Sequence, residues 1–159
     1  MEGWDLPSEE NRYLEHHVAR LVYSFTHWTG RSLAPNDISL QEQARQIFFA
    51  PFVVLSHNTA ANPLLNYANR CGLELFELTW DELTRLPSRQ TAEPNEQEDR
   101  QRLLATVTKQ GYIDNYRGIR VAKSGRRFLI EQATVWNLLD ENGGFYGQAA
   151  TFGHWKFLD

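Results

Sequence analysis

The segment from Ala50 to Phe76 constrains the fold more than any other part of the chain. Residues 52–55 form an apolar run of strand-favouring type, and residues 56–63 are crowded with Ser, Asn, Thr and Pro, which favour turns. Residues 64–67 can pair back as a second strand, and from Arg70 onward apolar residues recur at helical spacing. This order predicts a pair of strands that runs directly into a helix.

Two helices are predicted before the strand pair. Ser8 can cap the first helix, and Gly30 stands where a helix end favours glycine. Ser39 and Glu42 match a capping box for the second helix. The first helix carries an apolar stripe made of Leu14, Val18, Leu21, Val22, Phe25 and Trp28. We expect these helices, within residues 1–49, to cover a face of the sheet or to form a homodimer with a second subunit.

The second half of the chain predicts two more helices and three long strands. Thr79 and Glu82 match a capping box for a short helix, residues 87–94 read as a loop, and a helix follows from about Asn95 to Gly111. The predicted strands are Tyr112–Ala122, Arg126–Leu139 and Phe145–Trp155. Together these elements predict one α+β domain over residues 1–159, with a helical extension at 1–49 and a core at 50–159.

Composition limits the classes of function. At 159 residues, with 42% hydrophobic residues, the chain can bury a globular core. A formal net charge of -4 argues against direct nucleic-acid binding, which depends on clustered Lys and Arg. Cys71 is the only cysteine, so an internal disulfide is excluded. The polar N-terminus and the lack of an apolar run of ~18 residues predict a cytoplasmic protein that does not enter a membrane.

Six long motifs give the chain a recognisable family resemblance. They are APFVVLSH, PLLNYANR, LELFELTWDEL, LPSRQTAEP, GRRFLIEQATVWNLLDENG and YGQAATFGHW. Over residues 29–155 the sequence resembles a stand-alone bacterial member of the MEKHLA domain family, although the hexapeptide that names the family is absent. That family is similar to PAS domains and also occurs at the C-terminus of plant homeodomain-leucine-zipper transcription factors. The resemblance implies a five-stranded antiparallel sheet in the order 2-1-5-4-3 and a non-enzymatic sensory or interaction role.

A sheet covered by short helices can enclose an apolar cavity in which polar groups must pair or meet a ligand. Alternate residues of the strand Arg126–Leu139 form two sets, neither of them cleanly polar, so both faces should be covered and either set could face the cavity. Arg89, Arg120, Arg126 and Arg127 are candidates for recognising an anionic ligand, although arginines beside a turn are more often solvated. The predicted ligand-binding residues are Asn66, Tyr67, Asn69, Arg89, Gln132, Trp136, Asn137 and Gln148.

The identity of a cofactor stays open. In flavin photosensors of the PAS class a reactive cysteine lies in a central helix, and the matching stretch here, LPSRQTA, places Ser88 near that position. Thiol photochemistry is therefore excluded there, whereas non-covalent flavin remains an option. The five histidines are scattered and none lies between Pro87 and Gly111, which argues against haem and against a metal site.

Three functions compete at this point. The first is a sensor whose ligand, once bound, changes the packing of the N-terminal helices. The second is a small enzyme that uses Glu131 or Asp114 as base and Tyr116 or His154 as acid, although no catalytic motif links these residues. The third is a dimerisation module without a ligand, in which side chains such as Phe128, Trp136 and Phe152 fill the interior. The charged run at residues 96–102 is then a docking site or the solvated side of a helix.

Overall fold

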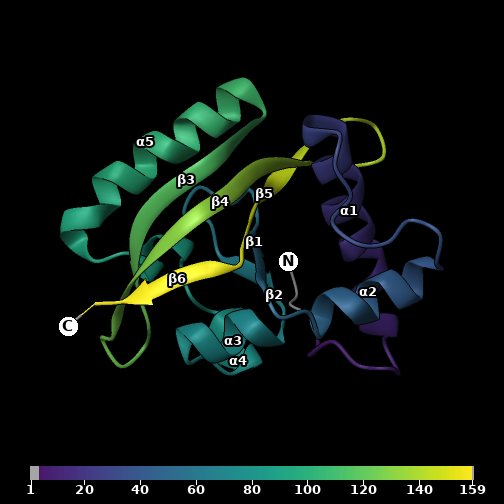
Figure 1. Cartoon of the computed structure of the whole chain (residues 1–159), viewed down its shortest axis with the longest axis horizontal. Coiled ribbons are helices and arrows are strands. Elements are labelled where there is room, and N and C mark those ends of the chain that lie inside the picture. Colours follow the sequence, from purple (N-terminus) through teal and green to yellow (C-terminus); the bar gives the residue numbers. More distant parts are fainter. Residues whose placement is uncertain (1–3, 159) are drawn as a thin grey trace.

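The predicted strand pair forms, and it makes up one side of a larger antiparallel sheet. The computed structural model describes residues 4–158. Its strands are β1 (Val53–His57), β2 (Leu65–Ala68), β3 (Tyr112–Val121), β4 (Arg127–Leu139), β5 (Phe145–Phe152) and β6 (His154–Phe157). The first five strands lie in the order β2-β1-β5-β4-β3, which confirms the predicted order. Figure 1 shows the long, curved β3 and β4 beside the shorter strands.

The sixth strand was not predicted. A single strand was expected over residues 145–155, but the structure divides this segment at Gly153 into β5 and β6. β5 pairs with residues 134–139 of β4, and β6 pairs with residues 128–131 of the same strand. β4 therefore has β3 along one edge and β5, then β6, along the other.

A bulge at Gln132 separates the two halves of β4. Gln132 has φ 56°, in the left-handed region, and the extra residue reverses the alternation of side chains. Phe128 and Ile130, before the bulge, lie on the same face as Val135 and Asn137, which come after it. This explains why neither alternating set of residues in the sequence was cleanly polar or apolar.

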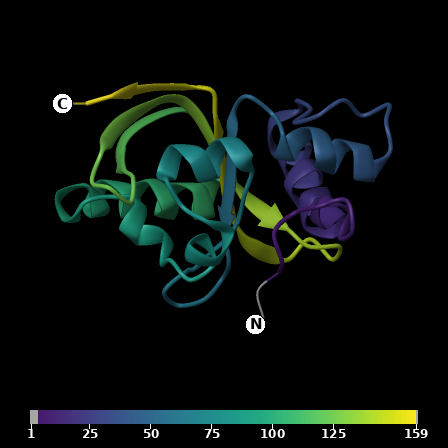
Figure 2. The same ribbon diagram turned by 90° about the horizontal axis from the view of Figure 1, so that it is seen from below.

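Helices cover both faces of the sheet, whereas the sequence predicted helices on one face and left open what would cover the other. One layer contains α3 (Arg70–Phe76), the 3-10 turn η2 (Ser88–Thr91) and α5 (Pro94–Gln110). The other contains the turn η1 (Arg12–Leu14), α1 (Glu15–Thr29) and α2 (Leu40–Phe48). The short α4 (Trp80–Leu83) lies against β2, and its Trp80 and Leu83 join the core on this second side of the sheet. Figure 2 shows the two layers on opposite sides of the sheet.

No helix within residues 4–158 has both the length and the apolar character needed to cross a bilayer.

The apolar stripe of α1 packs on the sheet of its own chain. Val18, Leu21 and Phe25 are buried against Trp136 and Leu138 of β4. The ring of Phe25 meets the ring of Trp136 edge-on at 5.0 Å. Of the two partners predicted for this stripe, the sheet of the same chain is therefore the one observed.

Ser8 does not cap α1, contrary to the prediction. The helix begins seven residues later, at Glu15, because Arg12, Tyr13 and Leu14 all have positive φ angles. The buried Tyr13 packs on the rings of Phe48 and Phe49, and this anchor fixes the turn before the helix. The backbone N–H of Ser8 donates to the Asn11 side chain within that turn. Gly30 ends the helix with φ 72°, as predicted.

The other cap predictions are confirmed with one difference. Thr79 and Glu82 form the complete capping box of α4. Ser39 caps α2 by accepting from the backbone N–H of Glu42, but the Glu42 side chain turns to Arg45 at 2.7 Å instead of closing the box. The predicted loop at residues 87–94 contains η2, and α5 begins at Pro94 and ends before Gly111.

Gly111 joins α5 to β3 at a point where α1 approaches closely. Its φ is 99°, its N–H donates to the carbonyl of Val107, and its carbonyl accepts from the N–H of Asn137. The ring of Trp28 occupies the space that a side chain at position 111 would need. A glycine is therefore required here both for the backbone angle and for the contact with α1.

We predict that Gly111→Ala destabilises the protein more than Gly125→Ala. Gly125 also has a positive φ, of 92°, but open space surrounds the position of its missing side chain. Both variants share a backbone penalty of about 1 kcal/mol, and only Gly111→Ala adds the overlap with Trp28, which should cost about 2 kcal/mol more. Urea denaturation of both variants measures the difference. Equal losses of stability would show that Trp28 moves aside freely.

Candidate ligand-binding site

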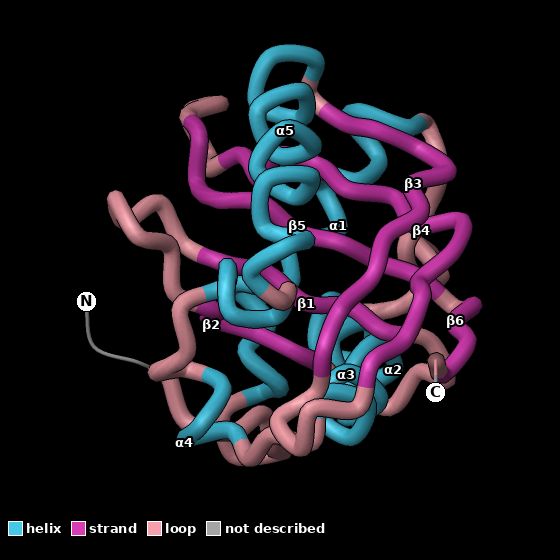
Figure 3. Tube along the Cα trace, turned by 90° about the vertical axis from the view of Figure 1, so that its left-hand side faces the viewer, coloured by secondary structure: helices cyan, strands magenta, loops and turns pink. Residues whose placement is uncertain are grey.

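A cavity of about 70 Å³ lies between the sheet and the helical layer formed by α3, η2 and α5. We call the side of the sheet that lines it the cavity face. Figure 3 views the molecule from outside this layer, with α5 in front of the strands. The apolar wall includes Leu55, Phe76, Leu103, Ile130, Val135 and Phe152. The polar lining residues are Ser56, His57, Ser88, Thr91, Arg100, Tyr116, Arg120 and Gln148.

Strand register brings two of the polar residues together. β1 pairs with β5 so that His57 lies opposite Gln148 and Leu55 lies opposite Ala150. Because side chains directly opposite one another point to the same face, both pairs reach the cavity from neighbouring strands. The segment that follows the predicted turn adds Leu65 to the lining, and the end of β1 adds His57, which pairs with Leu65.

His57 presents a buried ring nitrogen to the cavity. Its Nδ1 lies 2.9 Å from the carbonyl oxygen of Asn58, so Nδ1 carries the proton and Nε2 is an acceptor. Nε2 is buried and has no hydrogen-bond partner within residues 4–158. Burial lowers the pKa of His57 to about 4, and the positive charge of Arg100 lowers it further, although the Asn58 carbonyl and the nearby Gln148 side chain oppose the shift. His57 is therefore neutral near pH 7.

Two arginines reach the same cavity from different elements. Arg100 of α5 and Arg120 of β3 are each only 7% exposed. Arg100 Nη2 donates to the Ser88 hydroxyl at 2.6 Å, and Arg120 donates to the carbonyl of Ile119 at 2.8 Å. Neither forms an ion pair with a carboxylate in the described part of the chain. Burial, followed by the charge of Arg120, lowers the pKa of Arg100 to about 10.

Tyr116 connects one of these arginines to the surface. Its hydroxyl accepts from Arg120 Nη2 at 3.2 Å and donates to the Asp99 carboxylate at 3.1 Å. Gly118 leaves the space that the Tyr116 ring occupies. The carboxylate nearest to Arg120 in this network is thus reached only through a neutral phenol.

Gln148 and Asn137 form a polar connection from the cavity to α1. Gln148 Nε2 donates to Asn137 Oδ1 at 3.0 Å, and Asn137 Nδ2 donates to the carbonyl of Val107 at 3.0 Å. On the other side of the sheet, Trp28 Nε1 of α1 donates to the backbone carbonyl of Asn137 at 2.9 Å. A single residue of β4 therefore contacts the cavity layer through its side chain and α1 through its backbone.

Of the eight residues predicted to bind a ligand, the structure places only Gln148 in the cavity lining, with Asn137 directly behind it. Asn69 caps α3, and its amide donates to the carbonyls of Ile47 and Phe52, so its polar atoms are used within the fold. Arg89 is exposed and bonds Asn62. Gln132 is exposed at the bulge, where the reversal of β4 turns it away from the cavity.

The remaining three predicted residues lie on the α1 side of the sheet. Tyr67 and Trp136 are fully buried in the core that α1 and α2 cover, so they are not walls of the cavity. Asn66 accepts a hydrogen bond of 2.6 Å from the Ser56 hydroxyl. These three positions have one cause, which is that the face of a strand residue depends on register and bulges that composition does not reveal.

Sequence reasoning missed Arg100 and His57. Arg100 lies in the charged run at residues 96–102, which was interpreted as a docking site or a solvated helix side. Arg100 precedes Leu103 by three residues and Val107 by seven, so all three lie on the same, buried face of α5. This spacing is the sequence signal that could have predicted its burial. His57 was not among the predicted ligand-binding residues, and only the end of β1 at that residue brings it to the cavity.

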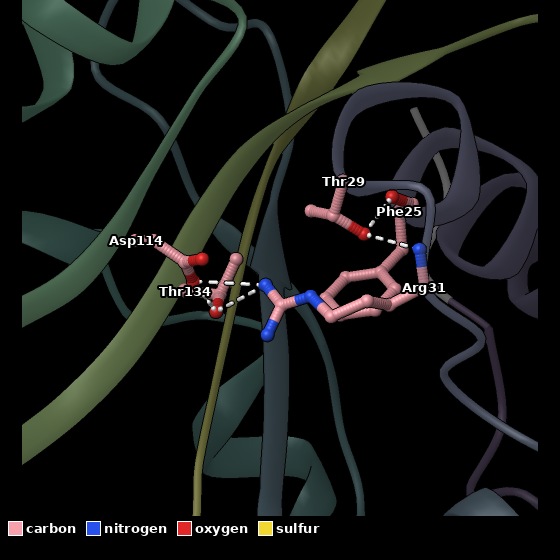
Figure 4. A network of polar contacts seen from close by, with 5 residues as sticks. All are labelled: Phe25, Thr29, Arg31, Asp114 and Thr134. Atoms are coloured by element: carbon pink, nitrogen blue, oxygen red, sulfur yellow. Dashed lines mark hydrogen bonds and ion pairs between the residues drawn. The ribbon is translucent and has the colours of Figure 1, made fainter.

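The carboxylates considered for catalysis lie elsewhere. Asp114 is half exposed and binds Arg31 at 2.8 Å and Thr134 at 2.6 Å (Figure 4). Burial raises the pKa of Asp114, but hydrogen bonds from Thr134 and Arg31 outweigh it and leave the pKa lowered. The Glu131 carboxylate lies 3.8 Å from Arg117 Nε and 3.8 Å from Lys156 Nζ. Of the proposed acids, Tyr116 lines the cavity and His154 is exposed on β6.

A second buried histidine lies on the α1 side of the sheet. His17 Nε2 is 2.9 Å from the Ser56 hydroxyl. Because that hydroxyl donates its proton to Asn66, His17 Nε2 must be the donor to Ser56. Burial, with a smaller effect of the Arg20 charge, lowers the pKa of His17 to about 3. No three His, Cys, Asp or Glu side chains gather as a metal-binding group in residues 4–158.

We predict that acid destabilises the fold partly through His17. Its pKa is about 3 in the folded state, whereas an exposed histidine, as in the unfolded chain, has a pKa of 6.5. Between these two values the unfolded chain binds one more proton than the folded chain. The stability due to a neutral His17 is complete above pH 6.5 and falls as the pH is lowered toward 3. The free energy of unfolding should fall by up to about 1.4 kcal/mol per pH unit from this group.

Urea denaturation between pH 7 and pH 5 checks this prediction. His17→Gln should show a shallower dependence on pH than the wild type. His16→Gln is the matched control, because His16 is the exposed neighbour on the same helix. Parallel pH profiles for the wild type and His17→Gln would contradict the assignment.

Comparison with known proteins identifies related sequences and folds. The MEKHLA domain model matches residues 15–157. Homeobox-leucine zipper protein ATHB-9 of Arabidopsis thaliana is 32% identical over 65% of this chain and 12% of its own length. Homeobox-leucine zipper protein HOX32 of Oryza sativa subsp. indica is 24% identical over 90% of this chain and 17% of its own length. The chain thus spans a small part of the curated relatives that it matches.

Solved structures share the fold at low sequence identity. A PAS domain from Colwellia psychrerythraea is 14% identical, with a TM-score of 0.62, over 75% of this chain and 96% of that one. A light-oxygen-voltage domain studied with a flavin analogue is 13% identical, with a TM-score of 0.57, over 74% and 85%. An RNA-binding light-oxygen-voltage receptor is 16% identical, with a TM-score of 0.59, over 81% and 35%. These likenesses confirm the PAS-like fold.

Proposed function

Because the chain belongs to the MEKHLA domain family, we propose that it is a non-enzymatic sensory module with a PAS-like fold. In this proposal a small molecule binds in the cavity under α5, and its binding changes how α1 packs on the sheet. The observation that carries the proposal is a cavity with an unpaired buried acceptor, His57 Nε2, joined by hydrogen bonds to α1. A buried polar atom without a partner is costly, so a ligand that satisfies it gains free energy.

The connection between β4 and α1 has two parts. The first is the Gln148–Asn137–Trp28 series of hydrogen bonds. The second lies just beyond the helix end, where the Arg31 guanidinium packs over Phe25 and binds Asp114 and Thr134. Figure 4 shows this second network, in which the Thr29 hydroxyl also accepts a hydrogen bond from the backbone N–H of Arg31. A shift of β4, or of the C-terminal end of α5 that contacts it, would therefore change the contacts of the C-terminal end of α1.

The size of the cavity favours a small ligand over a flavin. Pockets for ligands the size of a drug commonly measure 300–1,000 Å³, whereas this cavity measures about 70 Å³. A tricyclic flavin ring would require this cavity to widen. Ser88, at the position expected for a reactive thiol, lines the cavity and holds Arg100. We therefore propose a guest of only a few heavy atoms.

The enzyme alternative has less support than the sensor. Its two candidate bases, Asp114 and Glu131, lie outside the cavity lining and contact basic side chains. The lowered pKa of Asp114 is also opposite to what a general base near neutral pH requires. The ligand-free alternative is favoured by one observation, the small volume of the cavity.

The proposed homodimer would have to use the outer side of the N-terminal helices. Their apolar stripe is already buried on the sheet, but Tyr23 of α1 is 60% exposed and Phe49, after α2, is 40% exposed. These two side chains are the apolar groups that a second subunit could cover. We keep the cytoplasm as the proposed location.

A metabolite panel tests whether the cavity binds a ligand. The purified protein is studied by native mass spectrometry and by thermal unfolding with acids, amines, nucleosides and flavins. A specific compound should raise the midpoint of unfolding by several degrees at concentrations well above its Kd. No bound mass and no stabilisation by any compound would support the ligand-free alternative and end the sensor proposal.

We predict that Trp28→Phe separates binding from the response of α1. The variant keeps a ring at this position and removes the Nε1 donor to Asn137. Hydrogen exchange should show that the most stabilising compound of the panel slows exchange in residues 15–29 of the wild type. In Trp28→Phe the same compound should protect α5 but leave residues 15–29 unchanged.

Trp80→Phe is the matched control for that experiment. It removes an indole donor of the same kind, which bonds the carbonyl of Trp4 beside β2 and lies off the proposed route. Its response should equal that of the wild type. If ligand-induced protection of residues 15–29 is the same in Trp28→Phe and the wild type, the hydrogen bond does not couple the two sites.

A further inference from the structure

We propose that the ligand of this cavity is a small hydroxycarboxylate, with its carboxylate at Arg100 and Arg120 and its hydroxyl donating to His57. This inference rests on the proposed function, because it names the chemical class of the molecule that binds there. Three features of the cavity support it independently: an excess of buried positive charge, an unpaired acceptor, and a small apolar volume.

The charge argument begins from the two guanidinium groups. Arg100 and Arg120 are each only 7% exposed to solvent, and both line the cavity. Their hydrogen bonds within residues 4–158 go to a hydroxyl, a backbone carbonyl and a phenol. The Asp99 carboxylate reaches Arg120 only through Tyr116. Burying two like charges without a direct counterion is unfavourable, and an anion between them would offset that cost.

The donors that remain suit a carboxylate. A guanidinium group has five N–H donors, and the hydrogen bonds of Arg100 use one of them and those of Arg120 use two. Such groups bind carboxylate oxygens in bidentate fashion. The Ser88 hydroxyl accepts from Arg100, so its own proton is available to a ligand oxygen. The cavity therefore offers donors from η2, α5 and β3.

His57 requires the opposite kind of group. Its Nε2 is an acceptor, because the proton is held on Nδ1 by the carbonyl of Asn58. A carboxylate alone would place a second acceptor against this atom. A ligand with a hydroxyl on the carbon next to its carboxylate supplies both an anion for the arginines and a donor for His57. Among small acids this makes a hydroxyacid a better match than the parent acid.

The volume and the walls limit the remainder of the molecule. A cavity volume of about 10–15 Å³ is enough to hold one water molecule, so a cavity of about 70 Å³ has room for a few heavy atoms. Leu55, Ile130 and Val135 make its wall apolar, which suits a short carbon skeleton and disfavours a second charge. Free inorganic phosphate would satisfy the arginines but leave this apolar wall without a partner.

Racemic sodium lactate and sodium propionate are the matched probes, because they differ by one hydroxyl group. Thermal unfolding and isothermal titration are carried out with each salt at constant ionic strength, with sodium chloride and sodium phosphate as comparison salts. Lactate should raise the unfolding midpoint by about 5–10 °C at roughly 100 times its Kd. Propionate should bind at least about 10-fold more weakly, because His57 Nε2 then stays unpaired.

Arg100→Met and Arg120→Met test the charge argument. Each variant keeps an unbranched side chain and removes the guanidinium group, so lactate should bind at least about 10-fold more weakly. Without ligand, each variant should unfold at the same temperature as the wild type or higher, because the repulsion between the arginines is gone. Arg89→Met is the matched control, since Arg89 lies in the same η2 segment as Ser88 but is exposed. Its affinity for lactate should be unchanged.

Several results would overturn this inference while leaving the sensor proposal standing. One is stabilisation by a neutral or cationic compound of the panel but not by lactate. Another is equal binding of lactate to the wild type and to Arg100→Met and Arg120→Met, which would place any lactate elsewhere. Equal effects of lactate, phosphate and chloride would show a general effect of salt. Failure of every compound in the panel would instead remove the sensor proposal itself.

Discussion

The structure depends on β4 being covered on both of its faces. α1 packs on one face through Phe25 and Trp136, and α5 packs on the other through Val107 and Val135. A strand in this position has no solvent for its polar groups, so Thr134 and Asn137 must find partners inside the protein. They do so with Asp114 and with the end of α5. The polar contacts between the layers follow from this double burial.

The bulge at Gln132 determines which side chains of β4 face the cavity. Without the extra residue, Ile130 and Val135 would lie on opposite faces, and the wall of the cavity would be interrupted. With it, the two halves of β4 present apolar side chains to the same space while pairing with different strands, β6 and β5. The same strand can then support a cavity on one side and a continuous core under α1 on the other.

Electrostatics divides the two sides of the sheet. On the α1 side, His17 is neutral and its hydrogen bonds to Ser56, and from Ser56 to Asn66, are made within the protein. On the cavity side, His57 is also neutral, but among the described residues its second nitrogen has no partner and two arginines have no direct counterion. The α1 side also has two buried polar atoms without a partner among the described residues, Tyr67 Oη and Trp136 Nε1. What distinguishes the cavity side is its open volume and its two buried guanidinium groups. These two features are the physical basis for placing the ligand under α5.

The sequence by itself determined the elements and their order. Apolar runs, turn residues and caps such as Thr79 with Glu82 act over a few residues, and the family motifs carried the order of the five strands. Only the tertiary structure decided which side chains meet in the cavity. The end of β1 at His57, the register that sets it opposite Gln148 and the reversal at Gln132 depend on contacts between distant segments. Arg100 is buried for the same reason, because α5 turns it toward a sheet that local sequence does not specify.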